Sequence, residues 1–338
     1  MKRRSFLKAV GGATGGLALG VEAVLGAERP ETAKEVESVG GLPRRVLGRT
    51  GQKVSVVGFP GLSLARHDQK RCTEGLHAAL DRGVNYFDVA PAYGDAQAKM
   101  GVGLQGLDRG RYFLACKTNK RDKAGVREEL ERSLTLLKTD HLDLYQMHHL
   151  RRSEEVKQAL GPGGAIETFL KAKEEGKVRW LGFSAHTTQG AIEALQAFRF
   201  DAVMFPVSFV EYYLWGFGKE VLEFAAKRGA AVVAIKAMCR GAWPKGVEQS
   251  RKWWYRPVED PGEIELAWRF TLSQPGVVTG FPPAFLDLFE KAIEAAGKYR
   301  PITGPETDTL RRIANSCESI FQKEAQVTAA SPCGPPVV

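Results

Sequence analysis

The chain has 338 residues, of which 43% are hydrophobic, 26% charged and 9% aromatic, and its formal net charge is +9. Such a composition can bury a large core, which excludes a disordered chain, a collagen-like repeat and a disulfide-stapled miniprotein. Beyond the N-terminal segment the sequence holds no apolar run of about 18 residues, so we expect no stable membrane span after processing. No basic run is interleaved with aromatic residues, which argues against nucleic acid as a partner.

The N-terminus has the features of an export signal. Its charged head is Lys2-Arg3-Arg4-Ser5-Phe6-Leu7-Lys8. A weakly apolar, glycine-rich stretch follows, and small residues occur near position 27. This order is typical of a secretory signal, and the adjacent arginines resemble the twin-arginine signal of bacteria. We therefore expect residues 1–27 to engage the twin-arginine export machinery and to direct the protein to the periplasm or the cell surface.

The cysteines do not form a metal-binding motif. They are Cys72, Cys116, Cys239, Cys317 and Cys333. Their number is odd and no CxxC pair occurs, which argues against a zinc or iron–sulfur site. Only Cys317 and Cys333 lie in the same tail, and whether an oxidising compartment joins them stays open.

Short β-rich runs alternate with amphipathic segments along most of the chain. Residues 28–42 are polar without a clear pattern, and we expect a linker there. A small hairpin should follow, with residues 45–47 and 53 onward on either side of a Gly48-to-Gly51 turn. The expected strands after it are 54–59, 85–89, 112–117, 142–148, 178–183, 202–206, 231–236 and 277–280.

Helical periodicity separates these strands. The expected helices are 68–82, 96–107, 125–137, 166–175, 189–198, 219–227, 263–272 and 285–295, with apolar residues three or four positions apart. Glycines 83, 176, 229 and 297 are expected to follow helix C-termini. Eight strand–helix units predict a parallel sheet closed into a (β/α)8 TIM barrel over residues 43–300. A helical or irregular tail should occupy residues 301–338.

A doubly wound Rossmann sheet is the alternative fold. It requires a GxGxxG fingerprint after the first strand, followed by an acidic residue at the end of the second. The sequence instead reads Val57-Gly58-Phe59-Pro60-Gly61 at that place. The barrel is therefore favoured.

Ionisable residues stand at the carboxyl ends of neighbouring predicted strands. Asp88 ends the second strand, Tyr93 follows in its loop, Lys117 ends the third and His148 ends the fourth. In a barrel these ends form the active-site rim. Each residue alone could be structural, but the four together indicate a site.

Side chains alternate along a strand, which sorts the neighbours of these residues. If Lys117 points into the barrel, Cys116 faces the helices. If His148 points in, His149 points out, which argues against a metal site built from this pair.

The four residues suit proton transfer to a carbonyl oxygen. A buried Lys117 needs an anion, which Asp88 can supply. The ammonium should lower the pKa of Tyr93 toward working pH, so the phenol could act as a general acid. His148 could orient the substrate through a hydrogen bond. The set fits carbonyl reduction with hydride from elsewhere, and without a metal.

Three segments resemble motifs of the aldo-keto reductase family. They are residues 85–94 (NYFDVAPAYG), 115–118 (ACKT) and 143–148 (DLYQMH), and the resemblance covers about residues 43–297. It implies a (β/α)8 barrel that binds NADP(H), less often NAD(H), and interconverts a small carbonyl compound and its alcohol. By this resemblance Tyr93 is the proton donor, Lys117 lowers its pKa, Asp88 holds Lys117 and His148 positions the carbonyl.

The resemblance also implies residues that contact the cofactor. These candidates are Ser184, His186, Met204, Lys236, Met238, Arg240, Gly241, Gly280 and Lys291. Ser184 precedes Ala185 where the family usually has Asn, so His186 either replaces that Asn or only starts the next helix. Arg240 either meets a phosphate or is a solvated loop residue. No basic residue follows the last strand until Lys291, which leaves the preference for NADP open.

Other functions remain to be distinguished. A barrel with weakened cofactor use could serve as a binding or regulatory subunit. A sugar-isomerising or lyase barrel would need a metal or a second base. The loop 243–257, with Trp243, Trp253, Trp254 and Tyr255, either contacts substrate or packs on its own aromatic side chains.

Overall fold

The computed structural model describes residues 33–321. The expected signal segment and Cys333 lie outside the described residues. Within residues 33–321, no helix is both long and apolar enough to cross a membrane.

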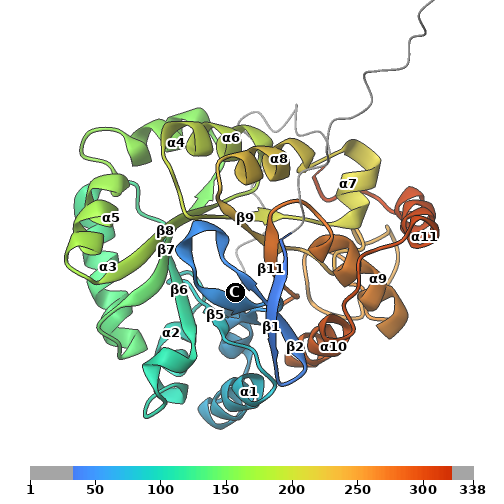
Figure 1. Ribbon diagram of the computed structural model, residues 1–338, viewed down its shortest axis with the longest axis horizontal. Coiled ribbons are helices and arrows are strands. Elements are labelled where there is room, and N and C mark those ends of the chain that lie inside the picture. Colours follow the sequence, from blue (N-terminus) through green and yellow to red (C-terminus); the bar gives the residue numbers. More distant parts are fainter. Residues whose placement is uncertain (1–32, 322–338) are drawn as a thin grey trace, which may run out of the picture.

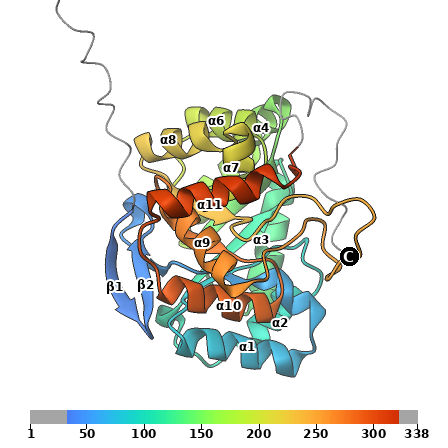
Figure 2. The same ribbon diagram turned by 90° about the vertical axis from the view of Figure 1, so that its right-hand side faces the viewer.

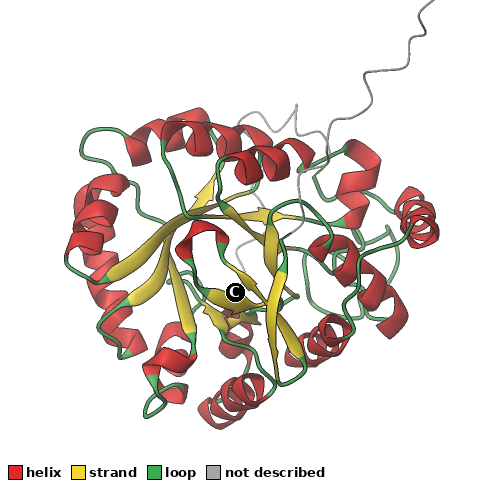
Figure 3. Ribbon diagram, viewed as in Figure 1, coloured by secondary structure: helices red, strands yellow, loops and turns green. Residues whose placement is uncertain are grey.

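Eight parallel strands form the centre of the molecule (Figures 1 and 3). They are β4 (Phe59–Pro60), β5 (Tyr86–Asp88), β6 (Phe113–Thr118), β7 (Leu142–Leu150), β8 (Val178–Ala185), β9 (Ala202–Pro206), β10 (Ala231–Ile235) and β11 (Val277–Phe281). Each strand pairs with its neighbours in chain order. A parallel bridge between Val57 and Gly280 joins the first strand region to the last and closes the sheet. The predicted (β/α)8 barrel is confirmed.

A ring of helices surrounds this barrel (Figure 1). They are α1 (Gln69–Asp81), α2 (Ala96–Gly103), α3 (Lys123–Leu137), α4 (Ser153–Leu160), α5 (Ala165–Glu174), α6 (Thr188–Ala197), α7 (Phe209–Trp215), α8 (Lys219–Lys227), α9 (Pro261–Leu272), α10 (Leu286–Gly297) and α11 (Gly304–Asn315). Several begin at a side chain that accepts a hydrogen bond from the first turn, as Asp68, Asp122 and Asp260 do. Three of the predicted glycines, at 83, 176 and 229, adopt positive φ after a helix, whereas Gly297 ends α10 itself.

The expected strand 54–59 is two strands in two sheets. β3 (Lys53–Ser55) pairs with β2 (Leu42–Val46), and only β4 belongs to the barrel. The chain leaves the first sheet at Ser55, whose backbone N–H donates to the Asn85 side chain at 2.7 Å rather than to a strand. The short helices α4 and α7 were also not predicted.

The polar residues before the barrel do not form a linker throughout. β1 (Glu35–Val39) lies inside the expected linker and pairs antiparallel with β2. The predicted hairpin between β2 and β3 is confirmed. The strands β1 and β2 lie against one end of the barrel, as Figure 2 shows from the side.

Aromatic rings fill the barrel interior. Tyr86 packs edge to face against Phe113 and Phe281, with ring centres 4.9 Å and 5.3 Å apart. Gly58 is required next to Phe281, because a Cβ at that position would lie 2.2 Å from the ring. These rings make this part of the barrel interior a packed core.

A buried arginine fixes the hairpin to the barrel. Arg45 is 1% exposed and donates hydrogen bonds to the carbonyl oxygens of Leu272 and Val277, both at 2.8 Å. Its guanidinium lies 4.8 Å from the centre of the Tyr299 ring. One side chain from β2 therefore satisfies the end of α9 and the start of β11.

We predict that Arg45→Met lowers the free energy of unfolding by about 2–4 kcal/mol, because two buried carbonyl oxygens lose the guanidinium as donor and Leu272 keeps only the Tyr299 hydroxyl at 3.4 Å. Urea unfolding followed by circular dichroism measures this. The neighbouring Arg44→Met is the control. Arg44 bonds Glu37 at 3.4 Å near the surface, so its loss should cost less than about 1 kcal/mol. Equal effects of the two variants would contradict this role of Arg45.

Candidate active site

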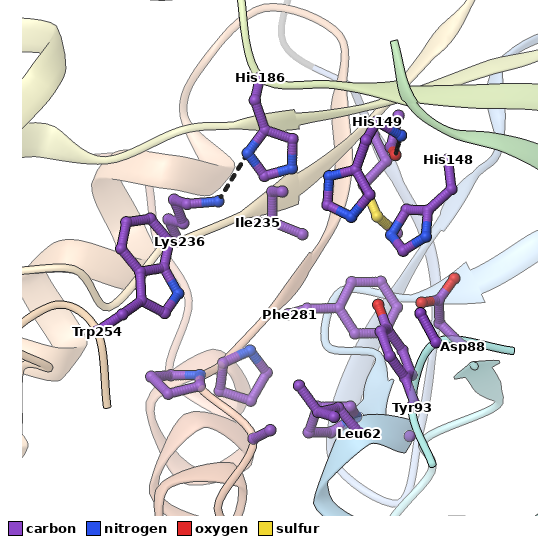
Figure 4. A pocket seen from close by; sticks show the side chains of 18 of the residues that line it. Leu62, Asp88, Tyr93, His148, His149, His186, Ile235, Lys236, Trp254 and Phe281 are labelled. Atoms are coloured by element: carbon purple, nitrogen blue, oxygen red, sulfur yellow. Dashed lines mark hydrogen bonds between the residues drawn. The ribbon is translucent and has the colours of Figure 1, made fainter. Parts of the chain in front are cut away.

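A pocket of about 500 Å³ opens at the carboxyl ends of the barrel strands (Figure 4). Its walls come from β4, β5, β7, β8, β9, β10 and β11 and from loops that follow several of these strands. This is the end at which barrel enzymes carry their active sites. Asp88, Tyr93 and His148 line it, and Lys117 lies directly beneath them.

The structure brings the four predicted catalytic residues together. The Lys117 ammonium donates a hydrogen bond to Asp88 and lies 3.3 Å from the Tyr93 hydroxyl oxygen. Gln146 donates to the other Asp88 oxygen at 3.1 Å. The rings of Tyr93 and His148 meet nearly at right angles, with their centres 6.0 Å apart.

The sheet register explains this meeting. Asp88 pairs with Ala115 and Lys117 pairs with Gln146 across adjacent parallel strands. Alternation along β6 sends Lys117 inward and Cys116 toward the helices, where Gln97 donates to its sulfur at 3.3 Å. Tyr93 reaches the site from a tight turn, in which its backbone N–H donates to Ala90.

Burial governs the charges of this group. Burial alone would lower the pKa of Lys117, but the interactions with Asp88 and Tyr93 raise it by more than burial lowers it. The pKa of Lys117 therefore lies above its ordinary value, and the ammonium is retained. Burial raises the pKa of Tyr93 above its usual 10, and this outweighs the lowering effect of Lys117. The expectation that the pKa of Tyr93 falls toward working pH is therefore wrong for the ligand-free protein. The phenol is protonated at neutral pH, which is the form a proton donor needs.

Two adjacent histidines both face the pocket. Alternation predicted that His149 points away when His148 points in, and this is wrong. His149 has φ +59, and the register between β7 and β8 shifts at this place. The left-handed backbone turns its ring alongside that of His148, with centres 3.7 Å apart. Among residues 33–321, no group of three or more His, Cys, Asp or Glu is arranged to hold a metal.

The histidines of the pocket are neutral. Burial lowers the pKa of His148 well below its usual value, with His149 and Lys117 adding to the effect. Burial likewise lowers the pKa of His149 to about 3 and that of His186 well below normal. Each ring therefore offers one N–H donor and one nitrogen acceptor.

Four of the predicted cofactor residues line the same pocket: Ser184, His186, Met204 and Lys236. The Ser184 hydroxyl oxygen accepts the backbone N–H of His149 at 2.9 Å. Lys236 Nζ lies 3.4 Å from His186 Nδ1, shown by the dashed line in Figure 4. Lys236 has φ +64, which costs a non-glycine residue about 1–2 kcal/mol.

The other five cofactor candidates do not line this pocket. Met238 is buried in the shell between barrel and helices, and Gly280 lies in β11 against Trp268. Gly241 packs on the backbone of Glu318. The two cations are engaged elsewhere: Arg240 bonds Glu263, and Lys291 Nζ donates to the Glu259 carbonyl at 2.9 Å. Both cations follow a predicted strand end in the sequence, but their contacts with Glu263 and Glu259 hold them away from the pocket.

The aromatic loop packs on its own side chains, one of the two alternatives left open, and part of it also faces the pocket. Trp253, Trp254 and Tyr255 line the pocket. They also pack on one another, with Tyr255 4.9 Å from Trp254 and 5.7 Å from Trp253 between ring centres. Trp243 stays behind them and donates to the Trp253 carbonyl at 2.7 Å.

Sequence reasoning missed three polar residues of the site. Gln146 stands two positions before His148, so the period of a strand could have placed it on the same face. Strand alternation wrongly excluded His149 from the site. Nothing in the sequence indicates the left-handed backbone that turns its ring into the pocket. Arg151, which lines the pocket, lies just beyond the expected strand end.

Comparison with known proteins identifies the family. The sequence profile described as "Aldo/keto reductase family" matches residues 59–280. Among curated proteins, the aldo-keto reductase YhdN of Bacillus subtilis is 30% identical over 189 residues, which cover 52% of this chain and 54% of that protein. The chain spans about half the length of the curated relatives it matches.

Solved structures share the fold. An aldo-keto reductase from Bacillus halodurans in its holo form has a TM-score of 0.66 and 24% identity, and the match covers 82% of this chain and 98% of that one. An aldo/keto reductase from Klebsiella pneumoniae in complex with NADP and acetate has a TM-score of 0.63 and 21% identity, with coverage of 80% and 94%. Since the family profile spans the whole barrel from β4 into β11, this chain belongs to the aldo/keto reductase family.

Proposed function

We propose that this protein is an NAD(P)(H)-dependent carbonyl reductase, reversible as an alcohol dehydrogenase, in which Tyr93 transfers the proton. The observation that carries the proposal is the contact of the Tyr93 hydroxyl with the buried Lys117 ammonium at 3.3 Å, beside Asp88 and at the floor of a pocket. Membership of the family supports the same activity.

The residues of the chain supply the proton chemistry. When bound, the reduced nicotinamide supplies a hydride to the carbonyl carbon. Tyr93 donates its phenolic proton to the carbonyl oxygen, and Lys117 stabilises the phenolate that forms. Asp88 keeps Lys117 in place, and the neutral His148 can donate its N–H to the same oxygen.

The pocket suits the reacting half of such a cofactor. Its volume of about 500 Å³ lies in the range of small-molecule sites. Ser184 and His186 line the same pocket as Tyr93 and offer hydrogen-bonding partners for a carboxamide. We expect NADP(H) rather than NAD(H) to bind, and this expectation rests on the family relationship alone. Arg240 and Lys291 do not support it, since both are bonded within the protein.

We predict that Tyr93→Phe lowers kcat for carbonyl reduction by at least about 100-fold, because the general acid is lost. Steady-state rates with a panel of small aldehydes and ketones measure this. Binding of NADPH, followed by quenching of its fluorescence, should change less than about threefold. Tyr213→Phe, on the outer helix α7, is the control and should keep full activity.

The same titration separates the proposal from its alternative. A binding or regulatory barrel with weakened cofactor use would bind neither NADPH nor NADH at millimolar concentration. If Tyr93→Phe turned over at the wild-type rate, the assignment of the proton donor would be wrong.

The ion pair should have separable effects on stability and on rate. We predict that Asp88→Asn lowers the free energy of unfolding by about 3–5 kcal/mol, because it leaves the Lys117 ammonium buried without a counter-charge. The double variant Asp88→Asn/Lys117→Met should recover most of that loss and remain inactive. Urea unfolding and reductase assays of both variants measure this, and a fully stable Asp88→Asn would contradict it.

We also propose that the protein is exported through the twin-arginine route, on the strength of residues 2–8. Cell fractionation after expression of the full chain should find it in the periplasm. Arg3→Lys/Arg4→Lys should retain it in the cytoplasm, whereas the control Lys2→Gln should still be exported. Cytoplasmic retention of the unaltered chain would overturn this proposal.

A further inference from the structure

We propose that Lys236 is a positioning residue for His186. By donating to Nδ1, Lys236 places the imidazole proton on Nε2, and the Nε2–H then donates to a carbonyl oxygen of the bound ligand, which for a nicotinamide cofactor is the carboxamide oxygen. This inference deepens the proposed function and rests on it for the identity of the ligand. The state of the histidine can be measured without any ligand.

The chemistry of the two side chains fixes the direction of the hydrogen bond. A lysine ammonium has three donors and no acceptor, so His186 Nδ1, 3.4 Å away, must be the acceptor. A neutral imidazole with its lone pair on Nδ1 carries its proton on Nε2. Figure 4 shows the Nδ1 side of the ring facing Lys236 and the opposite side turned to the cavity.

Lys236 is held in place from several directions. Its left-handed backbone, with φ +64, turns the side chain toward β8 at the point where β10 ends. The ammonium lies 5.2 Å from the centre of the Trp254 ring and 5.6 Å from that of Phe321. Such contacts with aromatic faces stabilise a cation that has left bulk water.

The Phe321 contact is itself anchored. The Phe321 ring stacks on Phe217, with centres 4.6 Å apart and planes 11° apart. Just before it, the buried carboxylate of Glu211 accepts hydrogen bonds from the Ser319 hydroxyl and, at 2.8 Å, from the Ile320 backbone N–H. The ammonium of Lys236 thus lies against a fixed wall, which limits its movement away from His186.

Lys236 contacts the edge of the His186 ring, and a second histidine packs on its face. Its ring stacks on that of His149, with centres 4.8 Å apart and planes 26° apart. The His149 backbone N–H donates a hydrogen bond to the Ser184 hydroxyl oxygen. The hydroxyl proton of Ser184 is not used in that bond and can be donated to a ligand. Two donors, the Ser184 hydroxyl and His186 Nε2–H, therefore come from the end of β8 and the residue after it, a pattern that suits a carbonyl oxygen.

The first experiment reads the tautomer directly. Long-range ¹H–¹⁵N correlation spectra of the ¹⁵N-histidine-labelled, ligand-free protein distinguish Nδ1–H from Nε2–H imidazoles, and His186→Gln assigns the signal. We expect the Nε2–H form in the wild type and in Lys236→Arg, which keeps a donor. Lys236→Met should populate the Nδ1–H form. An Nδ1–H ring in the wild type, or no change in Lys236→Met, would overturn the proposal.

The second experiment tests whether Lys236 acts through His186. Lys236→Met should weaken NADPH binding about fivefold to tenfold, the effect of one hydrogen bond, while Lys236→Arg should stay within about twofold. In His186→Gln, adding Lys236→Met should cause no further loss. Lys219→Met, a lysine 4.8 Å from the Tyr212 ring on the outer helices, is the control and should bind normally.

The outcomes separate this inference from the proposed function. If the wild type bound neither NADPH nor NADH, the proposed function would fail while the tautomer measurement still decided the role of Lys236. If NADPH bound and the two substitutions weakened it additively, Lys236 would contact the cofactor independently and the positioning role would be wrong.

Discussion

A lysine ammonium enclosed in protein must have a counter-charge, and this constraint organises the pocket. Lys117 is 0% exposed, so its charge is retained only because Asp88 meets it across the β5–β6 register. Gln146 then satisfies the second oxygen of Asp88, and Tyr93 closes over the ammonium. Asp88, Gln146 and Tyr93 are thus arranged around a positive charge that water cannot reach.

The three histidines of the pocket, His148, His149 and His186, are neutral beside this positive charge. Burial, assisted by Lys117, Lys236 and Arg151, holds the pKa values of the three pocket imidazoles low. A wall of neutral rings can donate and accept hydrogen bonds without repelling a cation or neutralising an anion. Such a wall would suit the proposed reduction, in which a bound nicotinamide would gain positive charge as it gives up hydride and Tyr93 would become a phenolate.

The sequence predicts those parts of the molecule that depend on periodicity. A period of two along parallel strands, together with barrel closure, was enough to place Asp88, Lys117 and His148 on one rim. It failed at His149, where the backbone turns left-handed. It also failed where a residue depends on a partner distant in sequence: Arg240 is held by Glu263 in α9, and no local pattern shows this. β1 escaped prediction because its exposed, mainly polar residues gain strand structure only by pairing with β2.

The contact between Lys236 and Phe321 joins two places 85 positions apart in the chain. All eight barrel strands are complete by Phe281, so a nascent chain could close the barrel while the segment that supports Lys236 is still inside the ribosome. The segment that contacts Lys236 is thus synthesised after all of the barrel strands. Loss of residues 319–321 would remove both the aromatic contact to Lys236 and the hydrogen bonds that Ser319 and Ile320 donate to the buried Glu211 carboxylate.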